Sequence, residues 1–81
     1  MFAATIRKTR FGPQPVRAVM QRERWTNAAL AVEVGVGYVE LYNAITGKSA
    51  PTAGLRDRLA AALKVPADDL FTTAALAGVR S

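Results

Sequence analysis

The sequence predicts an all-α fold of five short helices, and three observations support this prediction. Apolar residues recur at the three- and four-residue spacing of amphipathic helices over most of residues 15–71. Residues that favour helix starts and ends, among them Thr26, Gly35 and Gly47, stand at the boundaries of these segments. No apolar run approaches the roughly 18 residues of a membrane span. The chain is therefore expected to form one small helical domain without a membrane partner.

The first 14 residues precede the helical region. They lead into "FGPQP" (residues 11–15), whose glycine and two prolines interrupt regular structure, so residues 1–14 are predicted to form a flexible basic arm. The last proline of this stretch suits the first turn of a helix, where a missing N–H costs nothing. A first helix is then predicted to run to about residue 24, with three apolar residues at helical spacing: Val16, Val19 and Met20.

Residues 26–47 contain two predicted helices joined by a turn. Thr26 is a good N-cap for the first of them, and Gly35 stands where a left-handed residue ends a helix. Gly37 is an acceptable cap for the next helix, "YVELYNAIT", which Gly47 ends. The stretch "AVEVGVGYVELY" also alternates like a β-strand, but a lone strand would leave its backbone groups unpaired. Two helices joined by a glycine-containing turn of about three residues are typical of a helix-turn-helix motif.

The apolar residues of this region divide into inner and outer positions. Val34 and Val36 are predicted to point to the core from either side of the turn, and Val32 to lie on an outer face. Helical spacing predicts the remaining inner positions, which are Leu30, Ala31, Leu41, Ala44 and Ile45.

Two more helices are predicted towards the C-terminus. "LRDRLAAALK" has a stripe of leucines and is the clearest helix in the chain. Pro66 and the two aspartates that follow suit the positive end of a short fifth helix, which reaches Phe71. Residues 72–81 are apolar with little pattern and are predicted to form a C-terminal tail.

Basic residues are concentrated near the N-terminus. Residues 1–24 hold six arginines and lysines against one glutamate, so they account for the whole net charge of +5. This asymmetry favours an anionic partner, most simply nucleic acid. A basic tail kept for solubility is the alternative.

The composition argues against several other classes of function. The chain has no cysteine and no histidine, which excludes disulfides, thiolate metal sites and histidine catalysis. Its six carboxylates form no convergent pair except Asp68 and Asp69, which suit a helix start, so we expect no enzyme activity, no metal and no cofactor. The apolar stretch at the start is too short for a signal peptide, and we expect a cytoplasmic location.

Taken in order, these features resemble the phage-repressor type of helix-turn-helix domain, the XRE-type group that includes the lambda repressor and Cro proteins. The residues that carry the resemblance are Thr26, Asn27, Leu30, Ala31, Gly35, Val36, Leu41, Thr46, Gly47, Lys48, Pro51, Leu59, Leu63, Val65, Asp69, Leu70 and Phe71. The resemblance implies a compact five-helix bundle, a lambda repressor-like DNA-binding domain, over residues 15–71. Its second helix would lie across the DNA backbone and its third would enter the major groove.

The resemblance also implies which residues meet DNA. The positions of the recognition helix are Gly37, Tyr38, Val39 and Asn43. The positions along the DNA backbone are Thr26, Asn27, Thr46, Lys48 and Ser49. The N-terminal arm would add basic side chains that wrap the duplex or enter a minor groove, namely Arg7, Lys8 and Arg10.

The third helix is chemically unusual for a recognition helix. It has no arginine or glutamine for bidentate contacts with bases, and it carries Glu40. Asn43 suits adenine N6 and N7, while Val39 suits a thymine methyl group. Glu40 would either accept a hydrogen bond from cytosine N4 or lie solvated beside the DNA. Tyr38 and Tyr42 would either face the DNA or pack between helices.

One departure from the family gives a prediction about the core. Family members often bury an arginine of the first helix against a glutamate of the third, and these positions here hold Met20 and Ile45. Because both are apolar, no buried charge is left unpaired, and the two side chains are predicted to touch in the core. Trp25 is expected to anchor the core, and Arg17 and Arg24 to be solvated.

The sequence thus favours a sequence-specific regulator, a small phage or prophage repressor of the Cro or immunity-repressor type that blocks a promoter on double-stranded DNA. An antitoxin that binds DNA, and a helical module that binds another protein, are the alternatives. Such proteins usually bind as dimers. The predicted homodimer surface comprises Leu70, Phe71, Leu76 and Val79, although closure of the core is an alternative role for Phe71.

Overall fold

The computed structural model describes residues 10–79 of the 81-residue chain. In order, its elements are α1 (Val16–Arg22), α2 (Asn27–Val34), α3 (Tyr38–Thr46), α4 (Ala53–Leu63), the 3₁₀ turn η2 (Ala67–Asp69) and α5 (Thr73–Ala77). The described part of the chain contains no strand, which confirms the all-α prediction.

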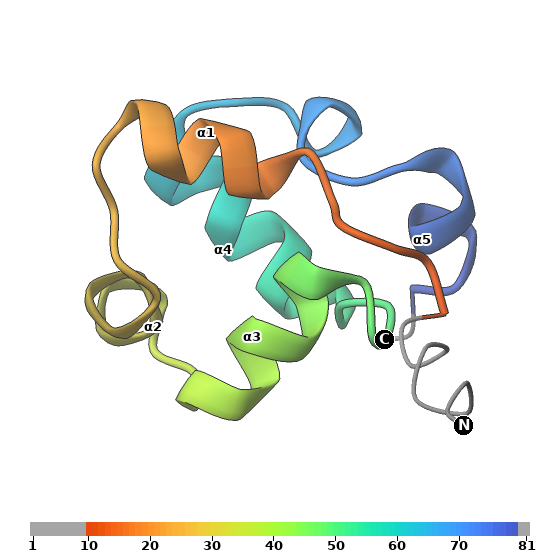
Figure 1. Ribbon diagram of the computed structural model, residues 1–81, viewed down its shortest axis with the longest axis horizontal. Coiled ribbons are helices and arrows are strands. Elements are labelled where there is room, and N and C mark those ends of the chain that lie inside the picture. Colours follow the sequence, from red (N-terminus) through yellow and green to blue (C-terminus); the bar gives the residue numbers. More distant parts are fainter. Residues whose placement is uncertain (1–9, 80–81) are drawn as a thin grey trace, which may run out of the picture.

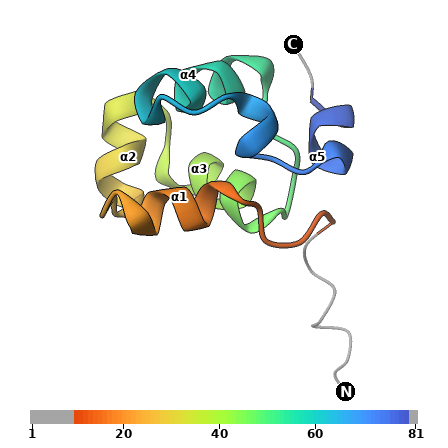
Figure 2. The ribbon, with the colours of Figure 1, turned by 90° about the horizontal axis from the view of Figure 1, so that it is seen from above.

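The helices enclose a single core. In Figure 1, α1 lies along the top, α3 forms the lower edge and α4 runs behind both. The view from above shows α1 and α4 on opposite sides of the domain, with α5 at the end away from α2 (Figure 2). Fifteen apolar side chains are buried together, and every α-helix supplies at least one of them.

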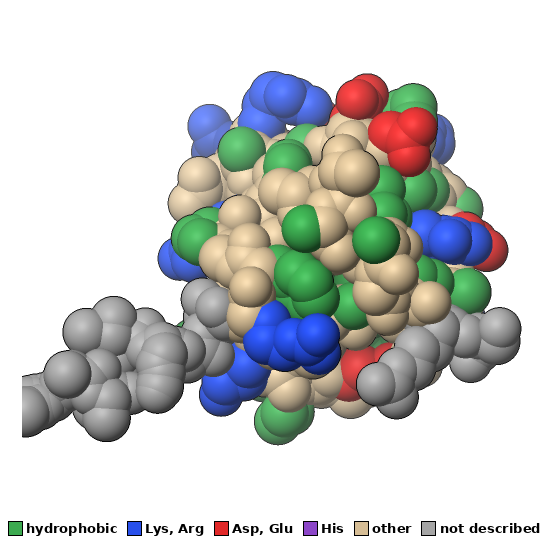
Figure 3. Space-filling view, turned by 90° about the vertical axis from the view of Figure 1, so that its right-hand side faces the viewer, with side chains coloured by type: hydrophobic (Ala, Val, Ile, Leu, Met, Phe, Trp, Pro, Cys, Tyr) green, Lys and Arg blue, Asp and Glu red, His purple; other side chains and the backbone are tan. Residues whose placement is uncertain are grey.

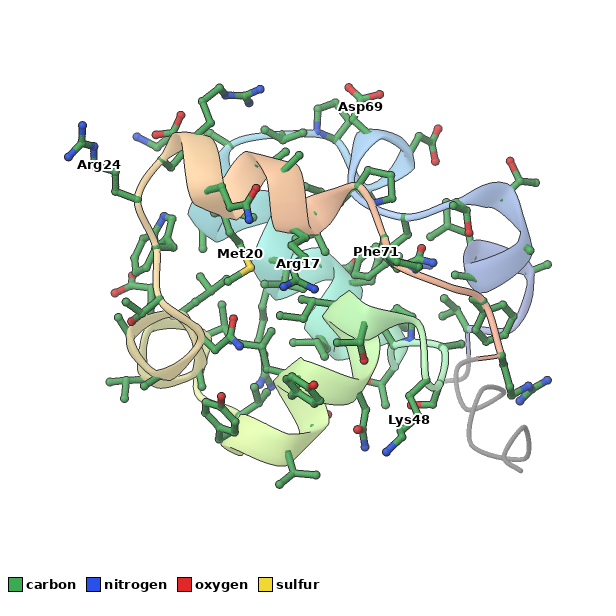
Figure 4. The ribbon with its side chains drawn as sticks, viewed as in Figure 1. Arg17, Met20, Arg24, Lys48, Asp69 and Phe71 are labelled. Carbon is green, nitrogen blue, oxygen red and sulfur yellow. The ribbon has the colours of Figure 1, made fainter. Side chains whose placement is uncertain are left out.

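Met20 and Ile45 both belong to this core. Each side chain is 3% exposed, so neither turns to solvent, as predicted. Figure 4 shows Met20 and Phe71 pointing into the domain and Arg24 pointing out of it. Trp25 is partly buried and packs against the same cluster, in agreement with its expected role as an anchor.

The alternating stretch between α2 and α3 is a helical turn. Gly35 has φ +72° and ψ 35°, the left-handed conformation that ends a helix at low cost in glycine. On its two sides Val34 is buried and Val36 packs partly buried against the core, while Val32 is 82% exposed. The predicted inner and outer positions are therefore confirmed, and the alternation has nothing to do with a strand.

This turn changes the direction of the chain sharply. The axes of α2 and α3 differ by 113° across the break between Val34 and Tyr38. Within residues 10–79 no single helix is long and apolar enough to cross a membrane, although this bent pair taken together meets the length and composition of a span.

The C-terminal region differs from the prediction. The expected fifth helix up to Phe71 is only the short turn η2, and the segment expected to be a tail contains α5. Thr72 explains the difference: its backbone is extended (φ −69°, ψ 160°) and its hydroxyl accepts a hydrogen bond from the N–H of Ala75. A residue that caps the next helix in this way interrupts the one before it.

The start of the domain also differs. Residues 11–14, expected in the arm, contact the helices: the N–H of Phe11 donates to Gly47 O at 2.7 Å and that of Gln14 to Ile45 O at 3.1 Å. Gln14 is 3% exposed. The boundary predicted at residue 14 therefore falls inside a segment that packs on the domain (Figure 2).

Candidate nucleic-acid interface

The most exposed surface of apolar side chains lies on α3. Leu41, Ala44 and Ile45 form the buried stripe of this helix. The remaining positions face outwards, and the exposed fractions are 68% for Val39, 51% for Tyr38 and 43% for Tyr42. We call this surface, with Glu40 and Asn43, the α3 face. Neither tyrosine is buried between helices.

The α3 face is held in place by α2 and α4. Thr26 caps α2, with its Oγ1 3.0 Å from the N–H of Ala29 that donates to it. At the other end of α2, the guanidinium of Arg58 on α4 donates to the carbonyl of Val34 at 3.3 Å. The turn to α3 follows Val34 directly, so hydrogen bonds hold both ends of α2, the helix that orients α3.

The two tyrosines of the α3 face form a stacked pair. Their ring centroids are 6.2 Å apart and the ring planes differ by 9°. Residues four apart lie one above the other on a helix, so the stack follows from the spacing. The pair presents two adjacent, nearly parallel aromatic rings on the surface of α3.

A hollow of about 400 Å³ runs between α3 and the loop that leads to α4. From α3 it is lined by Val39, Glu40 and Asn43, and from the other side by residues 49–52 and Leu55. A neighbouring hollow of about 250 Å³ shares residues 49–52 and is lined also by Arg10 and Gly78. The loop therefore stands between the α3 face and the N-terminal segment.

Gly37 stands at the start of the α3 face without a structural need for glycine. Its φ is −70°, which any residue adopts, and a Cβ added there would meet nothing within 4 Å. No side chain caps α3 at this position, although serine or threonine would do so. The space above Gly37 is open to whatever approaches α3 from outside.

The residues predicted along a DNA backbone differ in what their polar groups are free to do. Thr26 accepts a bond from Ala29, which leaves its own O–H hydrogen available to a phosphate. The hydroxyl of Thr46 instead donates to Tyr42 O at 2.7 Å. Because a hydroxyl has one hydrogen and phosphate oxygens only accept, Thr46 would have to give up this bond to contact a phosphate. Asn27 is half-buried at the start of α2.

Lys48 and Ser49 are exposed directly after α3. Figure 4 shows Lys48 pointing away from the domain at its lower edge, on the side of α3. Arg10 is also exposed and lies over the ring of Phe11, with 4.9 Å from guanidinium carbon to ring centroid. Figure 3 shows Lys and Arg side chains at the lower edge of one face of the domain, and also at its upper edge and on both sides. Arg7 and Lys8 lie outside the described residues.

The predicted dimer surface is only partly available. Leu70 and Phe71 are 0% and 1% exposed and belong to the core, so their assignment to a dimer contact is wrong. The turn η2 directs both side chains inwards, where the predicted helix would have left one face outside. Leu76 is partly buried against the core and Val79 is half-buried.

Two structural residues escaped the sequence analysis. Gln14 stands between two prolines, and Arg58 is one of two arginines on α4, so neither carries a local signal of a buried or long-range bond. Thr72 did carry a signal, since threonine before an apolar helical segment is a usual N-cap.

Arg56 and Asp57 on α4 form an ion pair. A hydrogen bond of 2.9 Å from Arg56 lowers the pKa of the Asp57 carboxyl and raises that of the Arg56 guanidinium. Both groups are accessible to solvent, so this pair contributes little to folding. Among the described residues, no group of three acidic or other metal-binding side chains is placed to hold a metal ion.

Comparison with models of protein families, with curated proteins and with solved structures finds no match to this chain.

Proposed function

We propose that this protein is a sequence-specific double-stranded DNA-binding regulator whose α3 enters the major groove. The observation that carries the proposal is the α2–turn–α3 unit: two helices at 113° joined by three residues, with the outer face of the second helix exposed. Helix-turn-helix motifs have angles of about 90–120° and comparable turns. An α-helix with its side chains is about 10–12 Å across, which suits a major groove about 12 Å wide.

The polar groups around α3 support this orientation. The free hydroxyl hydrogen of Thr26, together with Asn27, stands at the positive end of α2, where phosphates are favoured. Lys48 and Ser49 stand beyond the other end of α3. Phosphate contacts at both ends would position α3 in the groove, while the side chains of the α3 face contact bases.

In this proposal the protein is a small repressor of the phage or prophage type, with a lambda repressor-like fold, that acts in the cytoplasm by occupying an operator. The N-terminal arm, with Arg7, Lys8 and Arg10, supplies further contacts with the DNA. A homodimer would have to use Leu76, Val79 and their exposed neighbours, because the other residues predicted for that surface are in the core. A DNA-binding antitoxin would have the same α3 face.

A second candidate is a module that binds another protein. The α3 face favours it in one respect, because this helix carries no lysine or arginine and exposes one valine and two tyrosines. Exposed apolar and aromatic side chains of this kind are common at protein interfaces.

Selection of bound DNA from a random pool, repeated between 50 and 200 mM salt (roughly the range over which phosphate contacts weaken), tests the proposal. We expect an enriched site, and a palindrome would indicate a dimer with two half-sites. Asn43→Ala is expected to change the enriched sequence at one or two positions. Its matched control, Asn27→Ala on α2, is expected to lower affinity for all sequences. Absence of any retained DNA at low salt would favour the protein-binding module.

A further inference from the structure

The α3 face has a composition that suits one class of base edge. Within α3 the only charged side chain is Glu40, and the most exposed large apolar side chain is Val39. Beside them lies the stacked pair of Tyr38 and Tyr42. This surface therefore offers apolar contact, the carboxylate of Glu40 and the neutral polar groups of Asn43 and the two tyrosines, and α3 itself supplies no cation.

Base edges in the major groove differ in what they offer such a surface. Guanine presents two acceptors, N7 and O6, which usually bind arginine or lysine. Thymine presents a methyl group, and cytosine and adenine present amino donors. A carboxylate next to two acceptors is unfavourable, so Glu40 disfavours guanine, whereas a methyl group fits the valine and the two rings.

We propose that α3 recognises C5-methyl groups in the major groove through Val39 and the Tyr38–Tyr42 pair. This inference rests on the proposed function. Two bases carry such a methyl group, thymine and 5-methylcytosine, and both place it at the same edge of the groove. Glu40 would accept from an amino group of a neighbouring cytosine or adenine.

The stacked pair makes this recognition more effective than isolated side chains would. With ring planes only 9° apart, the two tyrosines form one continuous apolar surface along α3. Val39 and Asn43 are also four residues apart, so they form the adjacent row and share the hollow beside residues 49–52. A methyl group against Val39 would thus lie next to the amide of Asn43.

The test compares three versions of the site enriched from the random pool, using fluorescence anisotropy. In the first version uracil replaces thymine, which removes the methyl group and leaves base pairing unchanged. In the second, 5-methylcytosine replaces cytosine, and the third is unmodified. We expect a loss of about fourfold for each contacted thymine, or a similar gain for each contacted 5-methylcytosine, as the burial of one methyl group predicts. The two substitutions distinguish the two sources of the methyl group.

Val39→Ala is expected to remove most of this difference between modified and unmodified sites. Val32→Ala is the matched control, because it shortens a valine in the same way and Val32 is also exposed, at 82%, but lies on α2. It should keep the difference intact. A protein that binds its site with equal affinity in all three versions would overturn this inference and leave the proposed function standing. A protein that binds no DNA at all would overturn both.

Discussion

At the scale of single residues, Gln14 has a large structural role that its neighbours in the sequence do not indicate. Its Nε2 donates to Gly12 O at 2.9 Å and to Phe11 O at 3.3 Å, and its Oε1 accepts from the N–H of Thr72 at 2.8 Å and from the Thr72 hydroxyl at 3.2 Å. One buried amide thus joins the N-terminal segment to the start of α5. Within residues 10–79, every buried side-chain polar atom has a partner.

Gln14→Glu should destabilise the fold in a pH-dependent way. The new carboxylate would face two carbonyl oxygens in a buried site, and burial raises the pKa of such a carboxyl above its unfolded value. Stability is then greatest below the unfolded pKa, near 4, and falls as the pH rises through the folded pKa. We expect a cost of about 3–5 kcal/mol at pH 7, as for other unpaired buried charges, and a smaller cost at pH 4.

Urea unfolding at the two pH values measures this difference. Gln14→Met is the control, because it removes the same hydrogen bonds without adding a titratable group and should cost about the same at both values. Equal costs of Gln14→Glu at pH 4 and pH 7 would contradict the burial of this side chain.

Gly47→Ala should be far more damaging than Gly35→Ala, although both glycines have positive φ, +80° and +72°. A left-handed alanine costs about 1–2 kcal/mol at either position. At Gly47 the added Cβ would also overlap the backbone of Gly12, whereas at Gly35 it would meet nothing within 4 Å. Thermal unfolding of both variants measures the difference, and similar melting temperatures would mean that residues 11–14 do not pack against Gly47.

At the scale of elements, α3 starts without the side-chain cap that would make it more stable. Gly37 leaves its start without a side-chain cap, while Thr26, Thr52 and Thr72 cap α2, α4 and α5. Neither φ nor steric crowding requires glycine here. Close approach of an outside surface, such as a DNA backbone, is the explanation that the proposed function supplies.

Gly37→Ser should therefore separate stability from binding. The serine cap is expected to stabilise the fold by a few tenths of a kcal/mol, because serine caps slightly better than glycine. Its side chain would occupy the open space beside α3, and we expect the affinity for the selected DNA site to fall at least tenfold.

Gly37→Ala serves as the control, because it fills the same space without a capping oxygen. It should lose affinity similarly while stability falls slightly. Circular-dichroism melting and DNA titration together distinguish these effects. Unchanged DNA affinity in both variants would show that nothing approaches α3 at its start.

At the scale of the whole molecule, the N-terminal segment divides at Arg10. Arg10 is exposed, but from Phe11 onwards the backbone bonds to the end of α3, and Val16 N–H donates to Leu70 O at 2.9 Å. Residues 11–14 thus connect the end of α3 to the start of α5, and Val16 adds the bond to the η2 region, while the three predicted basic contacts all lie before them. Binding and folding should therefore be separable by truncation.

Removal of residues 1–10 is expected to weaken binding to selected and random DNA alike and to leave the melting temperature nearly unchanged. The loss of three cations should reduce the salt slope of log affinity by up to about three units. Removal of residues 1–14 should in addition lower the melting temperature, because the bonds of Gln14 are lost. Equal affinities of the full chain and the shorter truncation for both DNAs would contradict a role for the arm.

Local interactions make much of the structure of this protein predictable from its sequence alone. Thr26, Gly35 and Gly47 act through their own side chains or dihedral angles, so the bounds of α2 and α3 and the direction of their side chains could be predicted without any partner. The candidate residues Tyr38, Val39 and Asn43 follow from the resemblance to phage-repressor domains, and the exposure of Tyr38, Val39 and Tyr42 agrees with an outer position on α3.

Tertiary structure decided what depends on contacts between distant residues. Sequence spacing gives no sign that Gln14 bonds to Thr72, 58 residues away, or that Gly12 lies against Gly47. These contacts turn an apparent arm into part of the domain and place α5 where a tail was expected. The burial of Leu70 and Phe71 was decided in the same way, because it depends on how η2 closes the core and not on their apolar character. Local propensity sets the ends of helices, whereas burial is a property of the whole packed chain.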